Sequence, residues 1–390
     1  MAQRLTLQHF FALSVLLVLM LMASTAQAVS ALIPAPPQIA ARAYLVMDAD
    51  TGHVIAADRE DERFPPASLT KMMTSYVVEY EIAKGNIALE DMVLVSEKAW
   101  RTGGSRMFIQ EGTQVSVDDL LHGVIIQSGN DASVALAEHI AGSERAFADL
   151  MNQHARLLGM ENTHFENATG LPAEDHYSTA IDLAKLGKAL INEFPQHYAL
   201  YSQKYFTYNN IRQPNRNKLL WRDDSVDGIK TGHTDEAGYC LVASAERDDM
   251  RLISVVMGSS SEEVRAQESQ KLLSYGFRYY RTHALYEAGQ VLRDEKVWAG
   301  SRDQIRLGVA ENLAVTVPRG QTDQLEASIE LDKVIKAPVA SGDVLGQVQI
   351  TLQGERVASV PLVALEAVPE GGLFKRIWHA ILLFFIGLIG

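Results

Sequence analysis

The sequence has a single cysteine and fewer basic than acidic residues, and each shortage excludes a class of protein. A single cysteine, Cys240, among 390 residues rules out an intramolecular disulfide, so the fold must depend on its hydrophobic core. Cys240 lies in the apolar run at 239–243, which favours a buried structural thiol over a nucleophile. The formal charge of -13 argues against nucleic acid as the main partner, because a phosphate-binding protein needs a basic surface.

The histidines also lack the spacing of metal ligands, such as His-Glu-x-x-His. We interpret those of the middle section as core or surface residues (His122, His139, His154, His164 and His176), and we expect no metal and no cofactor. The chain does have the composition of an ordinary folded protein, 47% hydrophobic and 21% charged. Its length is enough for about two or three domains.

The first residues have the features of an export signal. Arg4 provides a positive charge, residues 10–22 are apolar, and Ala26-Gln27-Ala28 fits the small-x-small pattern of a cleavage site. We therefore predict a signal peptide over 1–28, with an uncleaved membrane anchor as the alternative. The protein is expected to be exported.

The last residues, 373–390, differ from the rest of the chain. A helix of this length is about 27 Å long; Lys375, Arg376 and His379 group on one face, and large apolar side chains cover the remainder. This pattern favours an amphipathic anchor on a membrane surface, with a spanning helix and a packed core helix as alternatives.

The section between these ends has the pattern of an α+β protein. Strands are predicted at 43–48, 53–57, 229–233, 239–245 and 251–257, with helices between the early and late strands and a long helix at 262–280. An antiparallel sheet flanked by helices, with a helical insert, is therefore expected over 29–284. Short apolar runs punctuated by Gly and Pro then predict a small all-β, sandwich-like domain over 285–368, followed by the anchor over 369–390.

A serine and a lysine three residues apart form the first candidate catalytic pair. Pro65 and Pro66 precede Ser68 and Lys71, and the pattern predicts a helix start, because proline is tolerated only up to the first turn. Residues three apart share a helix face. The lysine amine can take the serine proton only if burial or a nearby cation lowers its pKa. Taken alone, the pair is better explained as a helix cap beside a solvated lysine, because such a spacing arises easily by chance.

Two further motifs, each occurring once in the chain, contain the partners that such a pair needs. Ser128-Gly129-Asn130 lies at a predicted turn between helices, and Lys230-Thr231-Gly232 lies on a predicted strand. Each alone has an ordinary structural explanation. Together, in this order and in these elements, the motifs indicate one catalytic site.

The order Ser-x-x-Lys, Ser-x-Asn, Lys-Thr-Gly is the signature of the penicillin-recognising serine enzymes. The segments 66–73, 126–137, 215–221 and 226–234 resemble the low-molecular-mass D-alanyl-D-alanine carboxypeptidases of Gram-negative bacteria, as do the β-domain and the tail. The resemblance implies a DD-peptidase/β-lactamase-like domain. It also implies removal of the terminal D-alanine from peptidoglycan stem peptides through an acyl-enzyme, and covalent binding of β-lactams.

Roles for individual residues follow from this resemblance together with the chemistry of the site. Ser68 is expected as the nucleophile, Lys71 as its base and Ser128 as the proton relay to the leaving D-alanine. The backbone N–H groups of Ser68 and His233 are the candidates for the oxyanion. The substrate-binding residues are expected to be Asn130, Lys230, Thr231, Gly232 and His233, with Arg265 or Arg216 near the substrate carboxylate. For these two arginines, an ordinary surface position is an equally good interpretation.

Two alternatives remain open at this point. A β-lactamase on the same fold would need a group that activates the deacylating water, and Glu166 lies in a loop. Its surroundings, residues 165–171, do not match the pattern of such a glutamate. A non-catalytic β-lactam sensor or wall-binding scaffold is the other alternative, and the three intact motifs argue against it.

Overall fold

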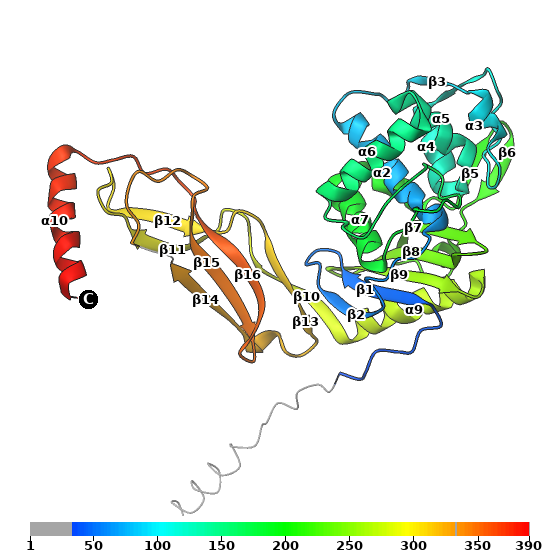
Figure 1. Cartoon of the computed structure of the whole chain (residues 1–390). Helices are drawn as coiled ribbons and strands as arrows, with labels where there is room; N and C mark the ends of the chain where they lie inside the picture. The colour runs from blue at the N-terminus through cyan, green and yellow to red at the C-terminus, as the bar shows by residue number, and fades with distance from the viewer. Residues whose placement is uncertain (1–32, 332–333, 390) are drawn as a thin grey trace, which may run out of the picture. The chain divides into compact units, whose positions relative to one another are not determined.

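A five-stranded antiparallel sheet forms the centre of the first domain, with the strand order β2-β1-β9-β8-β7 (Figure 1). The computed structural model describes residues 33–331 and 334–389, so the expected signal peptide lies outside it. The strands are β1 (Ala43–Asp48), β2 (Val54–Asp58), β7 (Val226–Thr234), β8 (Gly238–Arg247) and β9 (Met250–Ser259). The predicted combination of an early hairpin with late strands in one sheet is therefore confirmed.

Both faces of this sheet are covered by helices, which explains why β8 and β9 are apolar almost throughout. Helix α9 (Glu262–Tyr279) packs its Gly276 against Leu252 of β9. Helix α7 (Ala180–Glu193) packs against Ile253 of the same strand. Successive strand residues point to opposite faces, so α7 and α9 lie on opposite sides of the sheet (Figure 1).

The helices between β2 and β7 begin where the sequence provides capping side chains. Ser96, Ser116, Ser143 and Thr179 each accept a backbone N–H in the first turn of a helix. The elements of this section, besides α7, are α2 (Lys71–Ala83), α3 (Glu97–Arg101), α4 (Val117–His122), α5 (Asn130–Ala141), α6 (Glu144–Leu157) and α8 (Pro195–Tyr198). The short hairpins β3 (Met92–Leu94) with β4 (Gln114–Ser116), and β5 (Tyr205–Tyr208) with β6 (Ile211–Pro214), were not predicted.

The helix before the predicted turn at 128–130 is not regular to its end. Helix α4 ends at His122, and Gly123–Gln127 form one wider π-helical turn. Ser128 then adopts the left-handed conformation, with φ 64°. π-Helical turns and left-handed non-glycine residues are uncommon and cluster at functional sites. Ser128 therefore lies at the end of an irregular turn, and Asn130 begins α5.

The second domain is all-β, as the sequence predicted. Its sheet has the order β11-β12-β16-β15-β14, and a separate ribbon pairs β10 with β13. The strands are β10 (Tyr280–Tyr286), β11 (Val291–Lys296), β12 (Gln304–Gly308), β13 (Leu313–Pro318), β14 (Leu325–Leu331), β15 (Val344–Leu352) and β16 (Glu355–Ala364). Strand β11 was missed because its sequence, Val-Leu-Arg-Asp-Glu-Lys, is mostly charged.

The final helix, α10 (Leu373–Ile389), has two unlike sides. Lys375 pairs with Asp303 at 2.8 Å, and His379 Nδ1 accepts the backbone N–H of Ala299 at 2.8 Å. Large apolar side chains are exposed elsewhere on the helix: Leu373, Phe374, Ile377, Trp378, Ile381, Phe384 and Phe385. No helix within the described part of the chain is long and apolar enough to cross a membrane.

Candidate active site

The Ser-x-x-Lys motif lies in a tight turn at the start of α2. Ala67–Thr70 form a single 3-10 turn, and Lys71 is the first residue of the α-helix. Ala67 has φ 49°, an uncommon conformation for a residue with a Cβ. The predicted helix start is therefore correct in place, but Ser68 stands on a strained turn in front of the α-helix. Ser68 remains partly exposed while Lys71 is fully buried.

The Lys71 amine lies at the centre of the polar contacts. Its Nζ is 3.1 Å from Ser68 Oγ, 2.6 Å from Asn130 Oδ1 and 2.6 Å from the carbonyl oxygen of Thr169. The Asn130 side chain is fixed in turn, because its Nδ2 donates to the Gly103 carbonyl at 2.7 Å. The structure thus brings together the first two motifs, 59 residues apart in sequence.

Burial is the main influence on this lysine. Burial, together with the nearby charge of Arg216, lowers the pKa of Lys71 to about 7, against the smaller opposing effects of Asp131 and Glu144. An amine with a pKa in this range is available as a base near neutral pH. The sequence argument required such a shift but could not show that the side chain is buried.

The Lys-Thr-Gly motif contacts the Ser-Gly-Asn motif through its lysine. Lys230 Nζ donates to Ser128 Oγ at 2.9 Å and to the Thr231 carbonyl at 2.9 Å. Both the lysine and the serine are almost fully buried. Burial lowers the pKa of Lys230, and the charge of Lys71 lowers it further. A positive charge on Lys71 therefore disfavours a second positive charge on Lys230.

Gly232 allows β7 to lie directly against the serine turn. A Cβ at this position would be 2.9 Å from the Pro66 carbonyl oxygen and 3.2 Å from the Leu69 nitrogen. These backbone atoms cannot move aside cheaply, so the last residue of Lys-Thr-Gly has to be small. His233 follows on the same strand, and its ring stacks on Tyr239 with 4.0 Å between ring centres.

The two candidate arginines both border the cavity. Arg265 is only 4% exposed, so the interpretation as an ordinary surface arginine is wrong; its Nη1 donates to the Gly232 carbonyl at 3.2 Å, and its guanidinium lies 5.6 Å from the centre of the Tyr239 ring. Arg216 is exposed at the rim, and its Nε donates to the Gln127 carbonyl at 3.2 Å. Among the described residues, neither guanidinium donates to a carboxylate, so both have donors left for a ligand.

These groups surround one polar cavity of about 180 Å³. Its lining comprises Ser68, Ser105, Ser128, Arg216, Thr231, Gly232, His233, Tyr239, Glu262 and Arg265. The sequence argument missed Ser105, Tyr239, Glu262 and the Thr169 carbonyl. The carbonyl is a backbone group, and no side-chain motif could have indicated it. Glu166, set aside from the sequence, has an exposed side chain and is not in this lining.

A partly exposed serine beside a buried lysine, facing a Ser-Asn turn and a Lys-Thr-Gly strand, is the arrangement of the penicillin-recognising serine enzymes. Residues 30–261 match the family model for D-alanyl-D-alanine carboxypeptidases, and residues 280–370 match that for the C-terminal domain of penicillin-binding protein 5. The chain therefore belongs to the D-alanyl-D-alanine carboxypeptidase family of serine peptidases and is an enzyme of that class.

Similar proteins extend over nearly the whole chain. D-alanyl-D-alanine carboxypeptidase DacC of Escherichia coli is 47% identical over 375 residues, 94% of each protein. DacA of the same organism is 45% identical, covering 92% of this chain and 91% of the relative. The crystal structure of penicillin binding protein 5 from Haemophilus influenzae superposes with a TM-score of 0.83 at 45% identity, covering 86% of this chain and all of that one.

Proposed function

We propose that the enzyme removes the terminal D-alanine from peptidoglycan pentapeptide stems through an acyl-enzyme on Ser68. The observation that carries this proposal is the fully buried Lys71 amine, 3.1 Å from Ser68 Oγ. A neutral amine at that distance can take the hydroxyl proton as Oγ attacks the carbonyl between the two D-alanines. No metal and no cofactor takes part in this scheme.

The remaining steps use the other two motifs. The backbone N–H groups of Ser68 and His233 are proposed to stabilise the oxyanion of the tetrahedral intermediate. As the C–N bond breaks, Ser128 passes its hydroxyl proton to the leaving amine and takes up the proton that Lys71 accepted from Ser68, so that Lys71 becomes neutral again. Lys230, 2.9 Å from Ser128 Oγ, supports this transfer electrostatically. Water then attacks the acyl carbonyl while Lys71 takes a proton from it, and Lys71 returns that proton to Ser68 Oγ as the ester bond breaks, which releases the shortened peptide and restores Ser68.

Substrate binding is proposed along β7, which is an edge strand of the sheet. An edge strand has unpaired backbone groups that an extended peptide can match, so the stem peptide can lie beside Lys230, Thr231 and Gly232. Asn130 can accept a hydrogen bond from the substrate amide or donate one to it. Arg265, with Arg216 at the rim, is proposed to bind the terminal carboxylate, because a guanidinium pairs with carboxylates in a fixed geometry.

β-Lactams are proposed to acylate the same serine, because their ring amide presents a carbonyl to the nucleophile. A related solved structure supports this point. Penicillin-Binding Protein D2 from Listeria monocytogenes, in its ampicillin-bound form, superposes with a TM-score of 0.58 at 31% identity, covering 62% of this chain and all of that one.

The cellular position is proposed from the two ends of the chain. Residues 1–28 would direct export and be removed, and residues 373–390 would hold the enzyme on the periplasmic surface of the inner membrane. The row of exposed apolar side chains on α10, among them Phe374 at 89% exposure, supports the second point. The boundaries 29–284, 285–368 and 369–390 remain our proposal for the mature domains.

Substitution of the nucleophile tests the proposed function. Ser68→Ala should abolish both D-alanine release from a D-Ala-D-Ala peptide and covalent labelling by a fluorescent penicillin, with the folding checked by circular dichroism. Labelling that persists in this variant would exclude Ser68 as the nucleophile. In the wild-type protein, the ratio of D-alanine release to penicillin turnover distinguishes a carboxypeptidase from a β-lactamase.

A further inference from the structure

The inference concerns the loop at residues 167–171, which contacts Lys71 through the Thr169 carbonyl. As an ammonium, Lys71 can donate to all three of its neighbours. As a free amine it has only two N–H groups and one lone pair. The lone pair must face Ser68 Oγ if the amine is to take that proton. Its two N–H groups must then go to Asn130 Oδ1 and the Thr169 carbonyl, both 2.6 Å away.

The Thr169 carbonyl is aimed by the peptide unit to which it belongs. In a trans peptide the C=O of one residue and the N–H of the next point in opposite directions. The N–H of Gly170 donates to Asn167 Oδ1 at 2.7 Å, so the Thr169 carbonyl on the other side of the peptide points away from Asn167, and it meets Lys71. The hydrogen bond between Asn167 and the Gly170 N–H therefore sets the direction in which the Thr169 carbonyl points.

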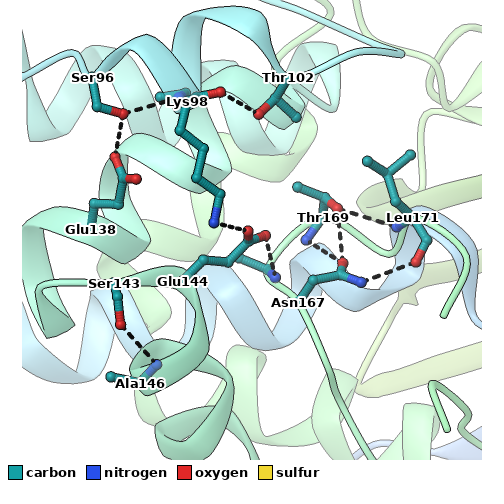
Figure 2. A network of polar contacts seen from close by, with 12 residues as sticks. Ser96, Lys98, Thr102, Glu138, Ser143, Glu144, Ala146, Asn167, Thr169 and Leu171 are labelled. Atoms are coloured by element: carbon teal, nitrogen blue, oxygen red, sulfur yellow. Dashed lines mark hydrogen bonds and ion pairs between the residues drawn. The ribbon is translucent and has the colours of Figure 1, made fainter. Parts of the chain in front are cut away.

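Asn167 is built into the loop through four hydrogen bonds, and Figure 2 shows those to Thr169 and Leu171. Its Oδ1 also accepts from the backbone nitrogen of Thr169 at 3.0 Å and from its hydroxyl at 2.8 Å. Its Nδ2 donates to the Leu171 carbonyl at 3.0 Å. One side chain thus holds the backbone on both sides of the carbonyl that faces Lys71.

Packing and further hydrogen bonds fix the position of the turn at Gly170 and of the residue before Thr169. Gly170 has φ 78°, and a Cβ there would lie 1.8 Å from the Ala67 carbonyl oxygen, so this turn packs directly on the serine turn. Ala168 is held on both sides: its N–H donates to Glu144 at 3.3 Å, and its carbonyl accepts from the Thr74 hydroxyl at 2.7 Å. Figure 2 shows Glu144 in turn paired with Lys98, at 2.8 Å.

We propose that Asn167 is a positioning residue for the reaction: it orients the Thr169–Gly170 peptide so that the Thr169 carbonyl takes one N–H of Lys71 and the amine lone pair faces Ser68. The inference rests on the proposed function of Lys71 as the base. The loop that follows Glu166 therefore contributes to the reaction through a backbone carbonyl and not through a catalytic carboxylate.

The test is the pH dependence of acylation by a fluorescent penicillin, measured in stopped flow for the whole mature protein. In Asn167→Ala the acceptor is no longer aimed at Lys71, so the plateau rate should fall by about tenfold or more. The carbonyl also stabilises the ammonium form, so its loss should move the midpoint of the acid limb down by about one pH unit.

Two further variants make the result specific. Asn167→Asp keeps an acceptor for the Gly170 N–H and adds a negative charge, so it should retain a plateau within about threefold to fivefold of wild type and move the midpoint to higher pH. This variant decides the matter if Asn167→Ala does not fold. The matched control is Asn152→Ala: Asn152 holds Phe165, two residues before the loop, through two backbone hydrogen bonds at 2.8 Å, and its loss should leave the midpoint unchanged.

An unshifted midpoint in Asn167→Ala, whatever its plateau, would overturn the inference, because a merely structural role lowers only the active fraction. An equal shift in Asn152→Ala would overturn it as well. Failure of the proposed function looks different, since the wild-type protein itself would then lack an acid limb near pH 7.

Discussion

At the scale of single residues, the chemistry depends on one amine whose charge is poorly tolerated. Lys71 has no carboxylate in hydrogen-bonding contact within the described residues; its three acceptors are neutral oxygens. Burial therefore dominates, and the pKa falls to about 7 rather than rising as it would in an ion pair. The lysine is accordingly strong enough as a base while remaining neutral in an appreciable fraction of molecules.

The first prediction is the pH dependence of acylation. The free amine is the active form, so the rate should be near its maximum above pH 8 and should fall about tenfold per pH unit well below pH 7. The measurement is the second-order rate of penicillin acylation between pH 5 and pH 9. A rate independent of pH over this range would contradict Lys71 as the base.

The second prediction replaces that amine. Lys71→Arg keeps a positive charge, but guanidinium does not release its proton at neutral pH, so acylation should fall by at least about a hundredfold. The rate should show no recovery at high pH, unlike that of the wild-type enzyme. Wild-type rates in this variant would overturn the role of Lys71.

A third prediction concerns stability. Glu79 of α2 is fully buried, and neither of its carboxyl oxygens has a hydrogen-bond partner among the described residues. Burial raises its pKa well above the ordinary value of 4.5, so the folded state holds a proton that the unfolded state loses as the pH rises. The free energy of unfolding should therefore decrease with rising pH above about 4.5, by at most about 1.4 kcal/mol per unit, until the folded-state pKa is passed.

Glu79→Gln removes this dependence because the amide is neutral throughout. Denaturant unfolding at pH 6 and pH 8 should give a smaller decrease for the variant than for wild type, and the variant should be the more stable of the two at pH 8. Glu81→Gln, in the same helix but in contact with solvent, is the control and should keep the wild-type slope.

At the scale of elements, the site depends on a close fit between β7 and the 3-10 turn that carries Ser68. Their contact places Gly232 against Pro66 and Leu69 with no room for a side chain. It also brings Thr231 to the cavity and Lys230 to Ser128. The relative position of the first and third motifs therefore follows from the approach of one strand to one turn.

A fourth prediction tests this fit. Gly232→Ala should push β7 away from the turn, which lowers penicillin acylation by about tenfold or more and costs about 1–3 kcal/mol of stability, as overpacking does. Gly187→Ala is the matched control, because its Cβ would meet only the flexible ends of Ile229 and Ile253; acylation should stay near wild type. Equal losses of activity in both variants would refute the specific role of the contact.

Most of these elements and the three motifs could be predicted from the sequence, because they depend on the type and spacing of side chains. It could not predict features that depend on backbone geometry or distant packing. Nothing in the sequence of Gly123–Gln127 distinguishes a π-helical turn from a continued α-helix, and only the structure shows that α4 ends at His122. The burial of Arg265 depends on Tyr239 and Gly232, which lie on other elements. The Thr169 carbonyl has no sequence signature at all.

At the scale of the whole molecule, the machinery of catalysis and the proposed attachment to a membrane are separate in sequence. Each group around the catalytic cavity comes from residues before 266, whereas the exposed apolar side chains of α10 begin at Leu373. The polar contacts of α10 with Asp303 and Ala299 occupy one side of the helix. In the proposed attachment, the opposite side would bury its apolar area in lipid, where each large side chain would contribute about 1.5–3 kcal/mol.

The last prediction separates the two functions. Deleting residues 373–390 should release a soluble enzyme that retains D-alanine release and penicillin labelling within about twofold to threefold, because no cavity residue is lost. The full mature chain should sediment with vesicles that contain anionic lipid, and the truncated chain should stay in the supernatant. The matched variant Phe374→Ser with Trp378→Ser keeps Lys375 and His379 in place and should weaken sedimentation without changing catalysis. A truncated protein that still sediments would show that the attachment lies elsewhere in the chain.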